Sequence, residues 1–253
     1  MTVRLKSWLR HLMPRAVGVR RIVGGPLRGL RILTSWHDYP AAILGRTEGP
    51  LLAWFEKNVL PGETWLDVGA HYGYTALALS RLVGLQGRVV AFEPVLGTVG
   101  HVAHTRRLNR LAQLTIIPCA LAALQDLELK QLPLVRGMVD STKPRGETCE
   151  TILAAGLDWL WPRICGDDRR VDGIKIDVQG MEIEALRGMR ETLQTYRPKL
   201  VLEPHPGVDR DMLLDLLESV GYRREGTPVE SLPGETTPQY HDDRSYAFWP
   251  AEG

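Results

Sequence analysis

From residue 64 onward the chain alternates short apolar runs with longer segments of helical periodicity, and this alternation limits the folds that it can adopt. Strands that alternate with helices are typical of βαβ units, in which a mostly parallel sheet has helices on both faces. A chain of 253 residues is long enough for one large domain, or for a domain with an appendage. The pattern therefore predicts an α/β fold.

The expected strands and helices follow from the positions of the apolar residues. Apolar runs predict strands at residues 64–69, 88–93, 114–120, 127–132, 173–178 and 199–204. Helical spacing predicts helices at residues 48–58, 74–83, 97–110, 151–161, 181–193 and 209–220. Near the two ends, the pattern predicts a helix at 5–13, extended or looped chain at 18–35, and a hairpin of 222–225 with 245–249.

Two glycines stand at the first strand-to-helix turn, in the stretch WLDVGAHYGYTALALS (residues 65–80). Ligands of open α/β sheets bind at the carboxyl ends of the strands, where this turn lies. Gly69 is expected to let the backbone approach a ligand, and Gly73 to let the helix begin close to the strand. A dinucleotide site needs G-x-G-x-x-G to seat a pyrophosphate, whereas this chain has G-x-x-x-G. The turn therefore argues against NAD and FAD.

An acidic residue ends the next predicted strand. Glu93 follows RVVAF, 24 residues after Gly69, and Pro94 ends the strand. A carboxylate at this place can accept hydrogen bonds from both hydroxyls of a ribose. A ligand with a free ribose and no pyrophosphate at the glycine turn fits S-adenosylmethionine. The alternative is a tight turn without a ligand and a solvated glutamate. For His71, between the glycines, packing and ligand contact both stay open.

Several stretches resemble the FkbM family of S-adenosylmethionine-dependent methyltransferases. They are LDVGAHYGYTAL (66–77), GRVVAFEPVLGT (87–98), the LN at 108–109 and IKIDVQGMEIEALRGM (174–189), with GPLRGLRI (25–32) and LGRTEG (44–49) upstream. The family usually has KIDVEG in the last stretch, where this chain has Gln179 in place of the glutamate. That departure leaves cofactor binding untouched but removes one possible acid near the fourth strand.

The resemblance implies a class I, Rossmann-like methyltransferase fold with seven strands, the last one antiparallel, and the cofactor at the ends of the first two. The expected cofactor-binding residues are Asp67, Gly69, His71, Gly73, Tyr74, Glu93, Pro94 and Ala120. The resemblance also implies methyl transfer, usually to a hydroxyl of a sugar, a polyketide or another natural product. A non-catalytic binding module of the same fold is the alternative, and a dehydrogenase is disfavoured because the third glycine is missing.

Transfer to an alcohol needs a general base, or a metal that lowers the pKa of the acceptor. Asp177, Glu203 and His205 follow the predicted strands 173–178 and 199–204, and they face one crevice if these strands are neighbours. They could hold Mg²⁺ or another divalent cation, in an arrangement resembling that of catechol-type O-methyltransferases. His205 could instead act as a base without metal, held by one of the carboxylates.

A purely structural role is the third possibility for these residues, with Asp177 capping the next helix and Glu203 paired with an arginine. Glu182 and Glu184 are expected to be exposed or first-turn residues that the helix dipole favours, without a catalytic role.

Charge is distributed unevenly along the chain. Eight of the 31 Lys and Arg lie in residues 1–37, which contain no acid, so 23 basic residues remain against 30 acidic ones. We therefore expect a basic arm or lid at 1–47 and the methyltransferase domain at 48–253. The arm is predicted to close the acceptor pocket, and membrane-surface contact is the less favoured alternative.

Composition narrows the partners and the compartment. The basic stretches lack the interleaved aromatics of single-strand binders, so we expect no nucleic-acid partner. The family resemblance implies a small-molecule acceptor with a hydroxyl group. A homo-oligomer is compatible with the sequence. The three cysteines, Cys119, Cys149 and Cys165, lack zinc spacing and are too few for a disulfide framework, which favours a cytoplasmic protein.

Overall fold

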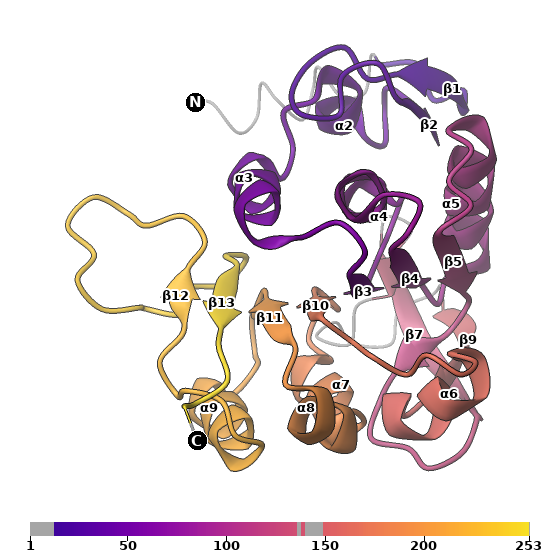
Figure 1. Ribbon diagram of the computed structural model, residues 1–253. Coiled ribbons are helices and arrows are strands. Elements are labelled where there is room, and N and C mark those ends of the chain that lie inside the picture. Colours follow the sequence, from indigo (N-terminus) through magenta and orange to yellow (C-terminus); the bar gives the residue numbers. More distant parts are fainter. Residues whose placement is uncertain (1–12, 136–137, 140–148, 253) are drawn as a thin grey trace.

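The computed structural model describes residues 13–135, 138–139 and 149–252 (Figure 1). The central sheet contains β3 (Thr64–Val68), β4 (Arg88–Phe92), β5 (Leu114–Ile117), β10 (Gly173–Ile176), β11 (Lys199–Leu202), β12 (Thr227–Pro228) and β13 (Tyr246–Phe248). The helices are α2 (Pro40–Leu44), α3 (Gly49–Asn58), α4 (Tyr74–Val83), α5 (Leu96–Leu108), α6 (Leu157–Ile164), α7 (Glu182–Arg187), α8 (Arg190–Tyr196) and α9 (Arg210–Ser219). Among the described residues, every helix is too short or too polar to span a lipid bilayer.

The strand order in the seven-stranded sheet is β12-β13-β11-β10-β3-β4-β5. The strands from β11 to β5 pair in parallel, and β13 is antiparallel to both of its neighbours. Figure 1 shows α3, α4 and α5 on one face of the sheet and α6 to α9 on the other. This arrangement confirms the expected α/β fold, with a mostly parallel sheet and an antiparallel last strand.

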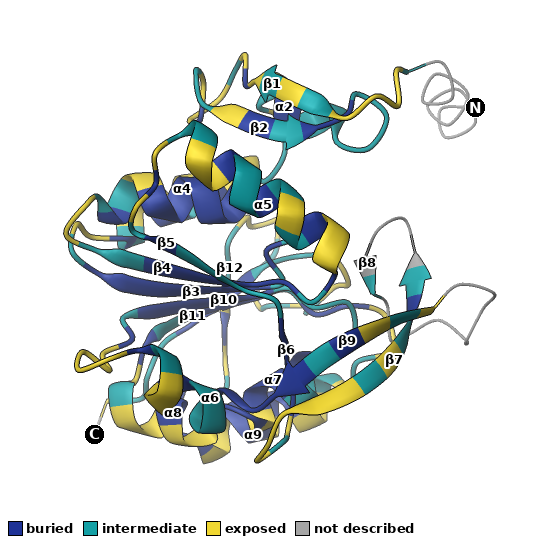
Figure 2. Cartoon of the chain, turned by 90° about the vertical axis from the view of Figure 1, so that its right-hand side faces the viewer, coloured by how far each residue is buried: buried dark blue, intermediate teal, exposed yellow. Residues whose placement is uncertain are grey.

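Each central strand contributes to two apolar cores because successive side chains point to opposite faces. Trp65 and Val89 pack in the cluster under α3 and α4, whereas Leu66 and Val90 pack in the cluster that includes the helices of the other face. All four side chains are fully buried, and Figure 2 shows the sheet enclosed between the two helical layers. The predicted strands read as continuous apolar runs because they are covered on both sides.

The segment before the sheet packs on the same core. An antiparallel hairpin of β1 (Gly18–Arg21) and β2 (Arg31–Thr34) lies against α5. Ile22, Leu27 and Ile32 join the cluster under α3 and α4. The helix predicted for residues 5–13 falls almost entirely on 1–12, which lie outside the described residues. The boundary between arm and domain at residue 47 stays a prediction.

The helix predicted at 151–161 was wrong in its first part. Residues Cys149–Ala155 form β9, and α6 begins only at Leu157. β9 belongs to a second sheet, of order β6-β9-β7-β8, that includes β6 (Ala120–Leu121), β7 (Glu128–Val135) and β8 (Met138–Val139). Pairing with β6 and β7 satisfies the backbone of this apolar run, so tertiary context decides over local periodicity.

Three other predicted elements differ in extent. The strand predicted at 114–120 ends at Ile117, and Ala120 enters the second sheet. The closing antiparallel pairing extends past 222–225: Tyr222 forms an isolated bridge with Pro250, and β12 pairs with β13. The helix predicted at 181–193 is broken at Gly188, whose added Cβ would lie 2.0 Å from the Ala122 carbonyl oxygen. After the break, the Asp158 carboxylate accepts the backbone N–H groups of Glu191 and Thr192 in the first turn of α8, which stabilises the new helix start.

The glycine turn after β3 has tighter constraints than the sequence indicates. Gly69 has φ +80°, and a Cβ on it would lie 1.8 Å from the Asp177 carbonyl oxygen. Gly73 has φ +81°, and its Cβ would lie 2.9 Å from Val102 Cγ1 of α5. Gly69 therefore lets two strand ends approach each other, and Gly73 accommodates a neighbouring helix. The contacts that require these glycines are therefore not contacts between α4 and β3.

We predict that Gly69→Ala destabilises the protein. Left-handed backbone strain alone costs about 1–3 kcal/mol, and the clash with Asp177 adds to it. Urea unfolding measures the loss. Gly97→Ala is the matched control, because Gly97 lies in α5 with nothing within 4 Å of its added Cβ, and alanine favours the helix. A Gly69→Ala protein as stable as the parent would contradict this account of the turn.

Candidate active site

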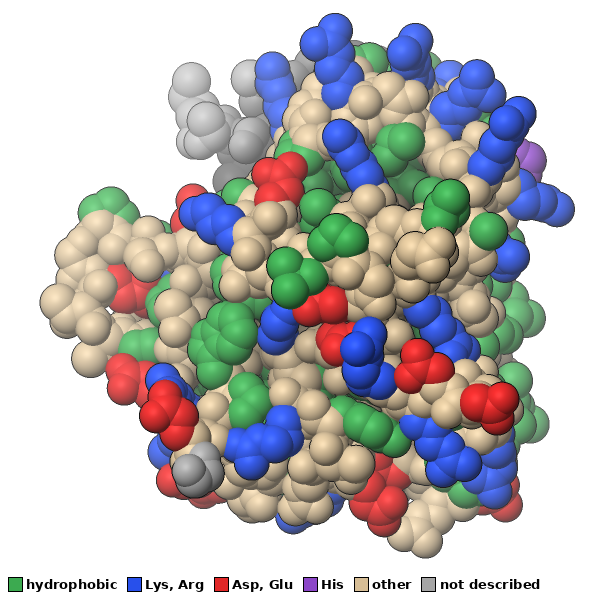
Figure 3. All heavy atoms as spheres, viewed as in Figure 1, with side chains coloured by type: hydrophobic (Ala, Val, Ile, Leu, Met, Phe, Trp, Pro, Cys, Tyr) green, Lys and Arg blue, Asp and Glu red, His purple; other side chains and the backbone are tan. Residues whose placement is uncertain are grey.

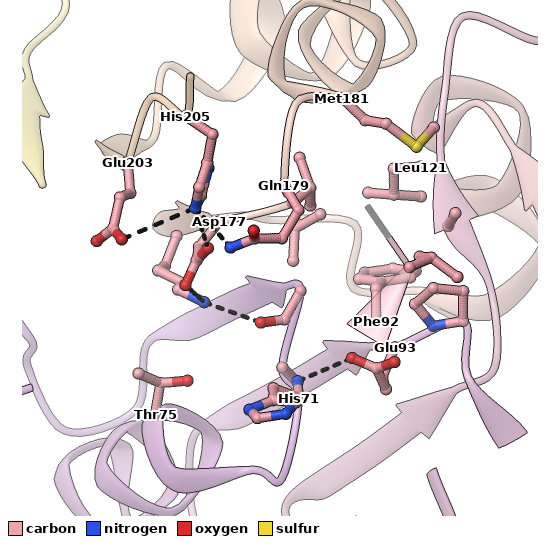
Figure 4. Close-up of a pocket in the computed structure, with 18 of the residues that line it drawn as sticks. His71, Thr75, Phe92, Glu93, Leu121, Asp177, Gln179, Met181, Glu203 and His205 are labelled. Carbon is pink, nitrogen blue, oxygen red and sulfur yellow. Dashed lines mark hydrogen bonds and ion pairs between the residues drawn. The ribbon is translucent and has the colours of Figure 1, made fainter. Parts of the chain in front are cut away.

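A cavity of about 350 Å³ opens at the carboxyl ends of the central strands. Its walls come from the turn after β3, the end of β4, the start of β6 and the segments that follow β10 and β11. Tyr39 and Glu48 close it from the N-terminal segment, whereas none of residues 13–38 lines it. Figure 4 shows side chains from these separate elements pointing into one space. The lid predicted at the N-terminus stays a prediction.

A buried lysine joins the strand ends beneath this cavity. Lys175, on β10, is 4% exposed, and its Nζ donates to the Gly69 carbonyl oxygen at 3.0 Å. The same Nζ lies 3.3 Å from Asp67 Oδ1 and 3.4 Å from Asp177 Oδ2. Asp67 also accepts a hydrogen bond from Thr75 Oγ1 at 2.7 Å. Burial disfavours the ammonium, but the charges of Asp177 and Asp67 outweigh it and raise the pKa of Lys175.

On the β4 side of the cavity, Glu93 is almost completely buried. Its Oε2 accepts the backbone N–H of His71 at 2.8 Å, and its Oε1 accepts that of Val95 at 3.0 Å. Burial raises the pKa of Glu93 to about 7. Each oxygen still has capacity for another hydrogen bond. Glu93 is therefore a preorganised acceptor inside the cavity and is not a solvated strand end.

Six of the eight residues expected at the cofactor line the cavity: Gly69, His71, Tyr74, Glu93, Pro94 and Ala120. The other two, Asp67 and Gly73, are not part of its lining; Asp67 holds Lys175 from below. Nε2 of His71 and the hydroxyl of Tyr74 are buried without a hydrogen-bond partner in the described part of the chain. Burial lowers the pKa of His71 to about 4, so its ring is neutral.

Across the cavity, the three expected catalytic residues come together. β10 and β11 pair in parallel, which brings Asp177, Glu203 and His205 to one edge of the sheet. One ligand atom from each lies within 4.8 Å of the others. His205 Nε2 is 3.4 Å from Asp177 Oδ1 and 3.9 Å from Glu203 Oε1 (Figure 4). Burial, and then the charge of Asp177, raise the pKa of Glu203 to about 7.

The partners of these carboxylates differ from the purely structural alternative. Asp177 pairs with Lys175, and Glu203 Oε2 accepts from Ser245 Oγ at 2.9 Å. In the described chain, no arginine forms an ion pair with Glu203.

Glu182 lies in the first turn of α7 as expected, but it is not exposed. Glu182 is completely buried, and its Oε1 lies 2.6 Å from His205 Nδ1. Its burial has a sequence signal, because Glu182 lies in helical phase with the core residues Ala185, Leu186 and Met189. A charged residue in such an apolar stripe needs a buried partner, and here the partner is the histidine.

The hydrogen bond to Glu182 places a proton on Nδ1 of His205 and leaves Nε2 as the acceptor. Nε2 of the Gln179 amide lies 2.6 Å from His205 Nε2, where it can donate. Burial alone would lower the pKa of His205, but the Glu182 hydrogen bond and the charge of Asp177 outweigh it and raise the pKa. The imidazole is thus oriented, with its proton-accepting nitrogen on the cavity side.

Comparisons with known proteins bear on the family of this chain. The model of the methyltransferase FkbM domain matches residues 67–224, more than half of the chain. A search of curated proteins gives no match. The solved methyltransferase FkbM from Methylobacillus flagellatus KT is similar, with 19% identity, a TM-score of 0.49 and coverage of 83% of this chain. This chain covers 53% of that one, about half of its length.

Two further solved structures have similar folds. The fibrillarin of Aeropyrum pernix, with natively bound S-adenosyl-L-methionine, is 14% identical at a TM-score of 0.50, and the match covers 93% of this chain and 88% of that one. An rRNA methylase from Streptococcus thermophilus is 10% identical at a TM-score of 0.50, covering 83% and 99%. At these identities the likeness shows the fold alone, which is that of the class I methyltransferases. With the family model matching most of the sheet and both sides of the cavity, this chain belongs to the FkbM family of S-adenosylmethionine-dependent methyltransferases.

Proposed function

We propose that this protein transfers a methyl group from S-adenosylmethionine to a hydroxyl group of a small acceptor, such as a sugar, a polyketide or another natural product. The observation that supports this reaction is the buried Glu182–His205 pair, which presents a proton-accepting nitrogen to the cavity that Glu93 lines from the opposite side. A labelled methyl group from the cofactor and a panel of hydroxylated acceptors would test the proposal. No transfer to any hydroxyl, with transfer to nitrogen or carbon acceptors, would reject O-methylation.

The residues on the β4 side of the cavity fit the cofactor. Glu93 can accept from ribose hydroxyls, and the unpartnered Tyr74 hydroxyl and His71 Nε2 offer further polar contacts. Phe92 and Leu121 line the same cavity and provide an apolar surface that suits the adenine ring of the cofactor. A volume of about 350 Å³ lies within the range of small-molecule sites. Bound S-adenosylmethionine would supply an electrophilic methyl group together with its own leaving group.

In this proposal His205 is the general base. The hydroxyl of the acceptor displaces the Gln179 amide from His205 Nε2. Nε2 then accepts the proton of that hydroxyl. The imidazolium that forms is stabilised by Glu182 at Nδ1 and by Asp177 near Nε2. Lys175 keeps Asp177 in position without neutralising the whole cluster. These groups are fixed before the reaction, so little reorganisation accompanies proton transfer.

A divalent cation held by Asp177, Glu203 and His205 is the second candidate, because their ligand atoms lie within 4.8 Å of one another. Such an ion would lower the pKa of the acceptor hydroxyl. It would have to displace the Gln179 amide from His205 Nε2, and it would share Asp177 with Lys175, which lies near Oδ2. The existing partners therefore favour the metal-free base.

The remaining expectations stay predictions. A module that only binds the cofactor would have no need of the Glu182–His205 pair, which favours an enzyme. A small-molecule acceptor, the lack of a nucleic-acid partner, a homo-oligomer and a cytoplasmic location are untested. The rRNA methylases among the similar structures share the fold at low identity and say nothing about the acceptor of this chain.

Glu93→Gln should weaken cofactor binding. The loss of charge-assisted hydrogen bonds to the ribose corresponds to on the order of 1.5–3 kcal/mol. Titration calorimetry with S-adenosylmethionine measures the change, and thermal unfolding checks that the variant is folded. Glu184→Gln is the control, because Glu184 is paired with Arg187 at the surface. Equal affinities for the folded Glu93→Gln protein and the parent would place the ribose elsewhere.

His205→Asn should reduce kcat by roughly a hundredfold to ten-thousandfold, the usual contribution of a general base. Cofactor affinity should stay close to that of the parent, because His205 lies across the cavity from Glu93. A chelator should leave the rate of the parent protein unchanged. If the chelator abolishes activity and Mg²⁺ or Mn²⁺ restores it, the metal candidate replaces the base.

The pH dependence of kcat/KM should report His205. The base must be unprotonated, so activity rises as pH increases through its pKa, which lies above the ordinary value for histidine. Glu182→Gln removes the carboxylate that raises this pKa, so the midpoint should move to lower pH and the plateau should fall. A midpoint that Glu182→Gln leaves in place would show that this carboxylate does not act on the titrating group.

A further inference from the structure

The β1–β2 hairpin and α5 form one continuous surface. The backbone N–H of Arg31 donates to Asn109 Oδ1 at 2.9 Å, and Asn109 Nδ2 donates back to the Arg31 carbonyl oxygen. The N–H of Leu33 donates to the hydroxyl of Thr105 at 3.0 Å. We call the outer side of residues 13–34 and 96–117 the hairpin face. These hydrogen bonds fix the hairpin face to the rest of the fold. None of residues 13–34 lines the cavity.

This hairpin face is strongly basic. Residues 13–34 and 96–117 contain no Asp or Glu. Their exposed arginines are Arg15, Arg21, Arg28, Arg31, Arg106, Arg107 and Arg110. Figure 3 shows Lys and Arg side chains gathered over the hairpin and α5, at the upper right of the view.

The charges of the hairpin face are uncompensated within the described chain. Some arginines outside the face do form ion pairs with acids, such as Arg210 with Asp242, Arg224 with Asp215 and Arg244 with Glu235. None of the seven exposed arginines of the face forms an ion pair with a described acid. Like charges held together repel one another, so the face is complementary to an anionic partner.

Exposed aliphatic side chains lie among these charges. Val17, Val19 and Val23 are 48%, 46% and 55% exposed, whereas Ile22, on the opposite side of the chain, is fully buried. These three valines and Arg21 occupy every second position of the chain, and all four are exposed to solvent. Aliphatic groups between basic residues suit the interface of an anionic bilayer. A single-stranded nucleic acid would call for exposed aromatic side chains, on which its bases stack.

We propose that the hairpin face docks the protein on an anionic membrane surface, with the arginines at lipid headgroups and the valines at the acyl boundary. The sequence of residues 1–12 adds Arg4, Lys6 and Arg10 and no acid just before the face. This proposal does not depend on the proposed function, because the residues that it uses are outside the catalytic cluster.

Vesicle flotation of the full-length protein tests the docking. The protein should float with phosphatidylcholine vesicles that contain phosphatidylserine and should not float with phosphatidylcholine alone. Binding should weaken as salt is added, because exposed charges are screened. Absence of binding to the anionic vesicles at low salt would overturn the proposal.

Charge reversal localises the contact. Arg21→Glu, Arg31→Glu and Arg106→Glu combined should reduce vesicle partitioning by about a hundredfold or more, since each basic residue near anionic lipid contributes on the order of a fivefold change. The control combines Lys57→Glu, Arg169→Glu and Arg190→Glu, which change net charge equally at exposed positions outside the face. If both triple variants lose binding equally, net charge and not this face is responsible, and the proposal fails.

A second variant tests the aliphatic contact without changing the charge. Its result does not depend on whether the triple arginine variant folds correctly. Val17→Ser, Val19→Ser and Val23→Ser combined should also reduce partitioning, while S-adenosylmethionine binding is retained in calorimetry. Full partitioning of this variant would show that the valines do not reach the bilayer. Loss of RNA binding in the charge variant, with unchanged vesicle binding, would assign the face to nucleic acid instead.

Discussion

The buried ammonium of Lys175 is the interaction on which the site depends. It connects two segments that are far apart in sequence: Asp67 and the Gly69 carbonyl oxygen at the end of β3, and Asp177 just after β10. A buried cation is costly unless it is paired, and here two carboxylates and a carbonyl compensate it. Because β3 and β10 are aligned with Asp67 opposite Lys175, the pairing register itself places these groups together. The glycine turn and the catalytic edge are therefore held at a fixed separation.

From that centre the cavity divides into two sides with different chemistry. On one side, Glu93 is held by two backbone N–H groups and offers its remaining lone pairs to a ligand. On the other, His205 is oriented by Glu182 and lies beside Asp177. The first side suits a hydroxylated, neutral part of a cofactor, and the second suits the removal of a proton. Both sides lie at the carboxyl ends of parallel strands, where the fold leaves backbone and side-chain groups unpaired for ligands.

Much of this site could be predicted from the sequence, because parallel strands end at one edge and the residues that follow them must meet there. Asp177 and His205 were placed together by that reasoning alone. The role of Glu182 is harder to predict, because a glutamate in the first turn of a helix is usually exposed, although its helical phase matches that of the core residues. Lys175 was missed although it is the one charged residue of the apolar strand GIKI. Local periodicity predicts a helix where the strand Cys149–Ala155 lies, because its partners, β6 and β7, are defined only by tertiary pairing.

A crystal structure with bound S-adenosylmethionine tests the central claim most directly, namely that one cavity holds the cofactor on the Glu93 side and the base on the His205 side. The ribose hydroxyls should lie within hydrogen-bond distance of the Glu93 carboxylate, and the methyl group should face the space beside His205. A cofactor bound outside this cavity, or bound within it with its ribose away from Glu93 and its methyl group turned from His205, would contradict the account.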